Sequence, residues 1–222
     1  MTTTHAPSVT RNRPELAALV TGVRAGVGAH LDWSRTAQLV AEQLRRHLPT
    51  PDVLTADERL GSPDSYRSHT LHVEHDGSFS IIAVVWRPGQ LTRIHDHVTW
   101  CVVGVIQGVE HEELFDANLN QLGSNDNHVG DVSGFAPPGD IHRVHNTAST
   151  TAISIHIYGT DVTRIGSSVR RYYDSPPVHG SRGAQLPRAD QRSRWWAPGP
   201  VRALRGCRCP WSCASGCGQA AL

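Results

Sequence analysis

Residues 89–108 read GQLTRIHDHVTWCVVGVIQG, and this stretch decides the fold. Two histidines, His95 and His97, stand one residue apart, and His142 follows a Pro-x-Gly turn at residues 137–139. Residues i and i+2 of a β-strand point to the same face, so His95 and His97 can present their imidazoles to one ion while Asp96 faces away. A third imidazole from a neighbouring strand would complete a metal site.

A chain with 14 histidines can place three of them close together by chance. The glycines that frame His95 and His97, and the turn before His142, favour a metal site instead. Imidazole is a good ligand for zinc, copper, iron and nickel, so the ligands alone leave the metal open.

The rest of the chain indicates helices followed by short strands. Apolar residues recur at helical spacing over residues 16–27 and 37–48, and prolines at 49 and 51 end the second helix. Segments rich in β-branched residues follow at 79–86, 102–106, 109–115 and 152–158, with a turn or bulge at Gln107 and Gly108. Residues 116–130 are rich in Asn, Asp and Gly and are expected to form a loop. The pattern predicts an α+β protein, mainly β, whose larger part is a β-barrel.

Composition limits the class of protein. The 222 residues suffice for one domain with a core, and residues 1–180 carry 14 arginines against 19 acidic residues, which argues against a nucleic-acid-binding surface. No stretch is long enough to span a membrane, and the N-terminus lacks the apolar core of a secretory signal. Only Cys101 lies outside the last 16 residues, so the cysteines do not predict a disulfide framework. We therefore expect a cytoplasmic protein with neither nucleic-acid nor membrane partners.

The ends of the chain differ from its middle. We expect a disordered N-terminus at 1–12, a single domain at 13–174 and a disordered tail at 175–222. Four cysteines in this tail, Cys207, Cys209, Cys213 and Cys217, offer a zinc site as the alternative, although their spacing is not the usual paired C-x2-C.

Residues 152–158 read AISIHIY and form a second candidate site. The alternation places the isoleucines on one face and Ser154, His156 and Tyr158 on the other. An ordinary strand would turn such a polar face to water, whereas a strand of a small barrel can turn it inside. In that case the three side chains would form a hydrogen-bonded relay whose phenol reaches a substrate at the metal.

Several segments together resemble the thiol dioxygenases of the cupin superfamily, the family of cysteine dioxygenase and 3-mercaptopropionate dioxygenase. They are WRPGQ at 86–90, IHDH at 94–97, VGVIQG at 103–108, IHRVHN at 141–146 and SIHIY at 154–158. The resemblance is strong over residues 60–174 and weak over the N-terminal helices. It implies a cupin double-stranded β-helix preceded by N-terminal helices. It also implies Fe(2+) held by His95, His97 and His142, with Ser154, His156 and Tyr158 beside it.

The resemblance implies an enzyme that adds both atoms of O2 to the sulfur of a small thiol, most directly L-cysteine to cysteine sulfinic acid. The usual cupin has a glutamate ligand where this chain has Cys101, and its loss leaves three neutral imidazoles. A non-catalytic metal-binding cupin is an alternative, but it would not need Ser154, His156 and Tyr158 on one face. A zinc-dependent isomerase is another, but such cupins normally retain the glutamate.

The resemblance also suggests substrate-binding residues. Cysteine-specific relatives place an arginine before the first core strand, whereas the 3-mercaptopropionate enzymes tend to place glutamine there. Arg67, with Tyr66 beside it, is the candidate to clamp the substrate carboxylate, unless Ser68 occupies that position. Cys101 corresponds to a cysteine that animal relatives join to the relay tyrosine, so a Cys101–Tyr158 thioether is a further hypothesis. Its alternative is a small buried hydrophobe.

Overall fold

Helices occupy the first part of the structure, a computed structural model in which residues 13–174 are described. The two main helices are α1 (Ala17–Gly28) and α2 (Trp33–Arg46), close to the predicted spans. The Asp32 side chain caps α2 by accepting a hydrogen bond from the backbone N–H of Arg35 (3.0 Å). The shorter helical segments are η1 (Pro14–Leu16), η2 (Pro51–Val53), α3 (Ala56–Arg59) and α4 (Val162–Ile165). The predictions for residues 1–12 and 175–222, the zinc site included, lie outside the described residues.

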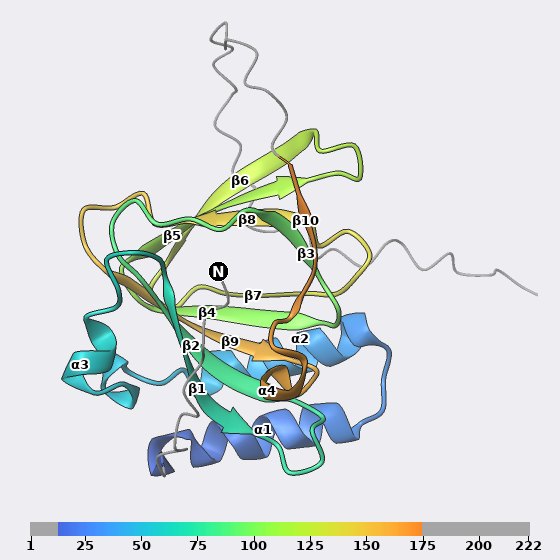
Figure 1. The fold of residues 1–222 in the computed structure, drawn as a ribbon. Helices are drawn as coiled ribbons and strands as arrows, with labels where there is room; N and C mark the ends of the chain where they lie inside the picture. Colours follow the sequence, from blue (N-terminus) through green and yellow to red (C-terminus); the bar gives the residue numbers. More distant parts are fainter. Residues whose placement is uncertain (1–12, 175–222) are drawn as a thin grey trace, which may run out of the picture. The chain divides into compact units, whose positions relative to one another are not determined.

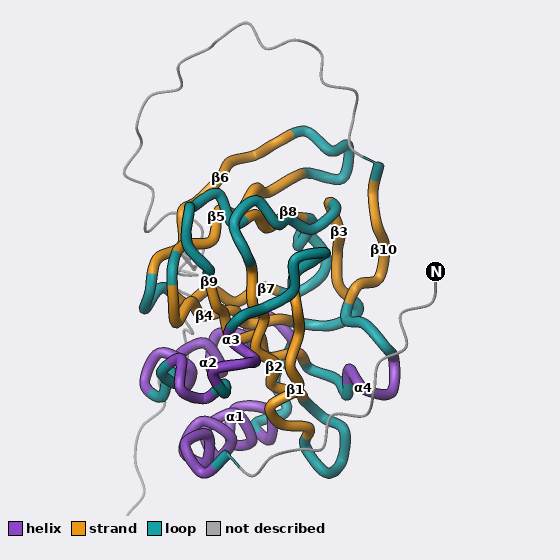
Figure 2. Tube along the Cα trace, turned by 60° about the vertical axis from the view of Figure 1, so that its left-hand side comes forward, coloured by secondary structure: helices purple, strands orange, loops and turns teal. Residues whose placement is uncertain are grey.

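Two five-stranded antiparallel sheets follow the helices. One sheet has the order β1-β2-β9-β4-β7 and the other β10-β3-β8-β5-β6. Figure 1 shows the sheets facing each other, with α1 and α2 covering the outside of the first sheet. The tube view shows the same helices on one side of the strands (Figure 2). The strands are β1 (Arg67–Val73), β2 (Ser80–Trp86), β3 (Ile94–His97), β4 (Cys101–Gln107), β5 (Val109–Phe115), β6 (Gln121–His128), β7 (Val132–Phe135), β8 (His142–His145), β9 (Ala152–Tyr158) and β10 (Val169–Tyr173).

This arrangement confirms the predicted α+β, mainly β class and the cupin barrel preceded by N-terminal helices. Within the described residues, none of the helices has the length and apolar character needed to cross a bilayer.

The core between the helices and the first sheet fixes which way strand β9 faces. Ile153, Ile155 and Ile157 are fully buried in the cluster that includes Leu19, Val40 and other apolar residues of α1 and α2. Burying one such isoleucine side chain stabilises the fold by about 1.5–3 kcal/mol. A one-residue slip of β9 would exchange these isoleucines for the polar residues between them. The packing therefore turns the alternate residues of β9 into the barrel.

The region predicted as a loop at residues 116–130 contains a strand. Strand β6 pairs with β5 from Val109 opposite His128 to Phe115 opposite Gln121. Apart from the exposed Leu122 and a glycine, its residues are polar, and most are exposed, so no apolar alternation marks the strand in the sequence. Hydrogen bonds to β5, rather than burial, hold β6 as a strand, and this prediction was wrong. The predicted turn is present: Gly108 joins β4 to β5 with φ of +72°, a conformation that favours glycine.

Candidate metal centre

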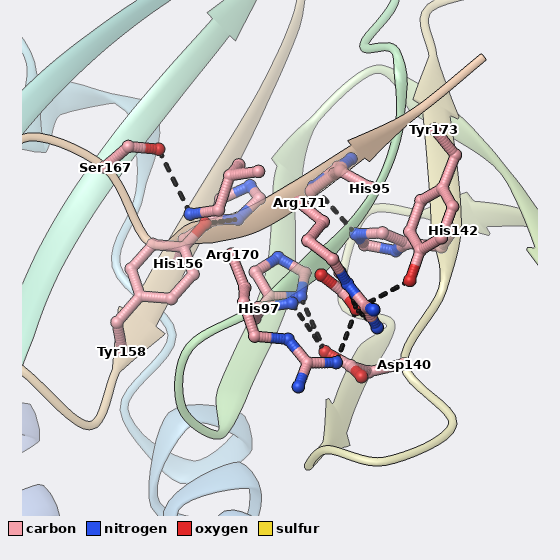
Figure 3. A network of polar contacts seen from close by, with 12 residues as sticks. His95, His97, Asp140, His142, His156, Tyr158, Ser167, Arg170, Arg171 and Tyr173 are labelled. Carbon is pink, nitrogen blue, oxygen red and sulfur yellow. Dashed lines mark hydrogen bonds and ion pairs between the residues drawn. The ribbon is translucent and has the colours of Figure 1, made fainter.

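Three histidines from two adjacent strands meet inside the barrel. His95 and His97 lie on β3, and His142 begins β8 directly opposite His95. One ring nitrogen of each residue lies within 4.8 Å of the other two, and all three side chains are buried (Figure 3). The structure thus brings together the three predicted ligands as a group that can hold a metal ion.

Two carboxylates orient two of these rings from behind. The Nδ1 atom of His142 lies 2.6 Å from Glu112 Oε1, and Nδ1 of His97 lies 3.1 Å from Asp140 Oδ2. The backbone N–H of His97 also donates to Asp140 (2.8 Å). Burial raises the pKa values of both carboxyls, but the hydrogen bonds from the histidines outweigh it and leave them lowered. A carboxylate behind a ligand histidine fixes the tautomer that leaves Nε2 free for metal.

The facing nitrogens of His95 and His142 test whether this site fits a cation. Nδ1 of His95 donates to the carbonyl of Arg93 (2.9 Å), so its Nε2 carries a lone pair. Burial, and then the neighbouring His142 and His97, lower the pKa of His95 to about 2, so the ring is neutral. With Nδ1 of His142 donating to Glu112, two Nε2 lone pairs face each other at 3.2 Å. A cation that accepts both lone pairs removes this repulsion, so the residues fit a divalent metal with nitrogen ligands.

Ser154, His156 and Tyr158, here called the polar row, line the barrel interior on β9. Ser154 Oγ lies 2.8 Å from His156 Nε2, and His156 Nδ1 lies 3.2 Å from the Tyr158 hydroxyl. All three side chains are buried, which excludes the alternative of a solvent-exposed polar face. Burial lowers the pKa of His156 to about 3. The Tyr158 ring centroid is 6.0 Å from that of His97, so the row ends beside the three histidines.

Cys101 lies next to the end of the polar row. It is the cross-strand partner of Tyr158 in the β4–β9 pairing, and both residues are buried. Burial raises the pKa of the Cys101 thiol well above its usual value. This neighbourhood permits the Cys101–Tyr158 thioether, which stays a prediction.

The structure does not bring Arg67 to the histidines. Arg67 pairs with Val85, whose side chain packs in the cluster against the helices. Directly opposite residues of an antiparallel pair share a face, so Arg67 lies on the outer face of β1. Ser68 pairs with Val84, which packs in the interior cluster, so Ser68 faces the interior. Ser68 was the alternative residue for the position of the expected arginine. Tyr66 also lies inside, with its ring centroid 4.6 Å from that of Trp86.

Asp96, between two ligand histidines, faces away from them as expected and fastens β10 to β3. Its Oδ2 accepts hydrogen bonds from Arg170, Arg171 and Tyr173 at 2.5–2.8 Å (Figure 3). Burial raises the pKa of Asp96, but these donors outweigh it and hold the pKa well below its usual range. These contacts hold β3, the strand that carries His95 and His97, against β10.

Sequence reasoning missed the residues behind the ligands. Asp140 stands two positions before His142, and Glu110 and Glu112 alternate on β5 as the histidines do on β3. This alternation is a signal that acids share one face, but it does not say that the face is inside. The indole Nε1 of Trp86 donates to Ser154 Oγ (3.3 Å) and was also missed.

Comparisons with known proteins identify a family that this chain matches. A family model described as "Cysteine dioxygenase type I" matches residues 56–171. Cysteine dioxygenase type 1 of Danio rerio is 30% identical over 114 residues, which cover 43% of this chain and 52% of that protein. The chain thus spans about half the length of this curated relative.

Two solved structures show a weak similarity to this chain. A recombinant oxalate oxidase in complex with glycolate has 18% identity and a TM-score of 0.39, and the match covers 45% of this chain and 53% of that one. The protein TT1209 from Thermus thermophilus has 16% identity and a TM-score of 0.39, over 48% of this chain and 96% of that one.

Proposed function

Because this chain belongs to the cysteine dioxygenase type I family, we propose that it is an iron(II)-dependent dioxygenase of a small thiol. In the proposed reaction, the O–O bond breaks and two S–O bonds form, so that a thiol and O2 give a sulfinic acid. Sulfur supplies all four electrons, and no external reductant is required. The thiol proton is released as the sulfinate forms.

A buried site of three imidazoles, with the polar row beside it, is the observation that carries this proposal. Bound by three neutral imidazoles, ferrous iron would keep its full positive charge, attract an anionic thiolate and bring it together with dioxygen. Cys101 stands where other cupins place a glutamate, so no ligand carboxylate would compete with the thiolate. A binding module would have no need of the polar row.

The chain's own residues have distinct roles in this proposal. Glu112 and Asp140 hold the His142 and His97 rings in the metal-binding tautomer. His156 fixes the position of the Tyr158 hydroxyl, which lies at the metal-facing end of the polar row. The phenol can then donate a hydrogen bond to reacting oxygen or sulfur. We assign Tyr158 as the residue that acts on the reacting atoms.

Apolar side chains line the interior around the polar row and exclude water. Ile82, Val84, Trp86 and Val144 form one buried cluster with Cys101 and Tyr158. A dry interior strengthens the electrostatic attraction between a bound thiolate and the metal and protects the reacting species from water.

L-Cysteine is the first substrate that we propose, because the family is described by its cysteine dioxygenase activity. 3-Mercaptopropionate is the second candidate; it carries the same carboxylate as cysteine, so the position of Arg67 on the outer face leaves that carboxylate without the expected clamp in either thiol. The two thiols differ only in the amino group, so a direct comparison separates them.

The experiment is anaerobic reconstitution of the full-length protein with Fe(II), followed by oxygen uptake with L-cysteine, 3-mercaptopropionate and cysteamine. We expect one O2 consumed per sulfinate, with both sulfinate oxygens labelled from ¹⁸O2. The zinc-loaded protein and His142→Ala are the controls, and neither should turn over. Absence of sulfinate from every thiol with bound Fe(II) would refute the proposed function.

A further inference from the structure

Tyr172 is an exposed aromatic residue beside the metal centre that the proposed function does not use. It is the cross-strand partner of His95 in the β10–β3 pairing, so the two side chains share one face, and their ring centroids lie 6.4 Å apart. His95 is 6% exposed, whereas Tyr172 is 50% exposed. Tyr172, on an edge strand of the second sheet, therefore marks the rim at which the metal centre approaches solvent.

Arg93 lies over the Tyr172 ring. Its guanidinium carbon is 4.8 Å from the ring centroid, which is the distance of a cation–π contact. Such a contact uses the face of the guanidinium and leaves the N–H groups along its edge able to bind a carboxylate through two parallel hydrogen bonds. The backbone carbonyl of Arg93 also accepts from His95 Nδ1 (2.9 Å), so this arginine is anchored directly beside a ligand histidine.

The present ion pair of Arg93 is easily exchanged. Its partner Asp174 lies 3.3 Å away and has a fully exposed side chain, and the Arg93 side chain is 60% exposed. An ion pair so exposed contributes little to stability. Arg170 and Arg171, in contrast, bind Asp96, whose side chain is 0% exposed, and their loss would leave a buried charge unpaired. Of these three arginines, Arg93 is the one that can turn to a substrate.

The interior of the barrel directs a substrate carboxylate to the same rim. Its deep side is lined by the buried apolar side chains of Ile82, Val84 and Val144. The Glu112 carboxylate behind His142 adds a negative charge that repels another carboxylate. A buried charge without a partner is costly. A thiol held at the metal centre through its sulfur would therefore extend its carboxylate toward the exposed side, where Tyr172 and Arg93 lie.

We propose that Arg93 binds the carboxylate of the substrate and thereby selects small thiols that carry a carboxylate. The Tyr172 ring holds the guanidinium in place for this contact. Arg67, on the outer face of β1, has no part in it. This inference deepens the proposed function and rests on it for its catalytic meaning. It places L-cysteine and 3-mercaptopropionate in one substrate class and leaves cysteamine, which has no carboxylate, outside it.

The test is an anaerobic titration of the full-length, Co(II)-loaded protein with 3-mercaptopropionate and with its methyl ester, followed by the thiolate-to-cobalt absorption. The ester presents the same thiol without the negative charge, and the wild type should bind the acid more tightly. Arg93→Ala should raise the Kd of the acid by about 10- to 100-fold and change the Kd of the ester by less than about twofold. Arg93→Lys keeps the charge without the planar fork, so its Kd for the acid should be intermediate.

Arg24→Ala is the matched control. Arg24 also pairs with an acid, Glu74, and its side chain is 56% exposed against 60% for Arg93, but it lies on α1. This variant should bind both ligands as the wild type does. A wild type that binds the ester as tightly as the acid, an Arg93→Ala protein with unchanged Kd for the acid, or an equal loss of both ligands would overturn the inference. The titration uses neither iron nor oxygen, so absence of sulfinate formation, which would refute the proposed function, is observed separately.

Discussion

Replacing Glu112 by Gln should weaken metal binding without removing any ligand. The Glu112 carboxylate accepts from His142 Nδ1 at 2.6 Å, and both side chains are at least nine-tenths buried. A hydrogen bond to a charged group contributes about 1.5–3 kcal/mol and a neutral one about 0.5–1.5 kcal/mol. Glutamine keeps a neutral acceptor, so the expected loss is about 1–1.5 kcal/mol, or roughly tenfold in affinity.

A rotated amide would enlarge this effect. If the glutamine NH2 group faces Nδ1, the His142 proton moves to Nε2 and blocks metal binding. Loss of such an outer partner typically costs about 10- to 100-fold in metal affinity, which sets the upper end of the expected range.

The assay is competition for Zn(II) between the protein and a chromophoric chelator at neutral pH. Glu113→Gln is the control, because Glu113 pairs with Arg143 rather than with a ligand histidine. Thermal unfolding of the metal-free proteins verifies that both variants are folded. Equal zinc affinities of the Glu112→Gln and Glu113→Gln proteins would refute the assignment of Glu112 as the group that holds the His142 tautomer.

Four further predictions follow from the site. Tyr158→Phe removes the phenol hydroxyl next to His156, and kcat should fall by about 100-fold or more while stability changes by about 1 kcal/mol; unchanged oxygen uptake would remove Tyr158 from the reaction. Arg67→Ala should leave the KM values for cysteine and for cysteamine unchanged, because Arg67 shares the outer face with Val85. A rise in KM confined to cysteine would show that Arg67 does bind the substrate carboxylate. Mass spectrometry of the digested, iron-loaded protein after turnover should detect a Cys101–Tyr158 peptide pair lighter by two hydrogens, since these residues are cross-strand partners; only free Cys101 peptide would exclude the thioether. The pKa of Glu110 rises on folding from 4.5 to about 7, so the folded state binds this proton more tightly than the unfolded state does. The free energy of unfolding of the wild type, relative to that of Glu110→Gln, should therefore fall by up to about 3 kcal/mol as pH rises through this window. The same pH dependence of the urea-derived unfolding free energy in both proteins would contradict the shift.

The local pattern of the sequence was sufficient to group His95 with His97 and to group the polar row, whereas His142 was predicted from the turn before it and from the family resemblance. The spacing of His95 and His97 places both on one face of a strand, and the alternation from Ser154 to Tyr158 does the same for the row. Both inferences need only the two-residue period of a strand. The helices were likewise predicted from the apolar spacing and from the prolines at 49 and 51.

The pairing of strands could not be derived from such local patterns. Strand β6 has no apolar face and exists because β5 bonds to it, so its residues were predicted as a loop. The pairing of Cys101 with Tyr158 joins residues 57 positions apart through the β4–β9 register. Register is a tertiary property, because partners distant in the chain determine it.

The sequence by itself determined which residues share a face, and only the tertiary structure decided which face points inward. The two-residue period of β1 places Arg67 and Ser68 on opposite faces of the strand. The packing of Val85, the partner of Arg67, against the helices decides that Arg67 faces outward and Ser68 inward. In the same way, β5 alternates acids without indicating that Glu110 and Glu112 are buried behind the site. The reason is physical: a strand's period is local, whereas burial is set by the second sheet and the helices that cover the first.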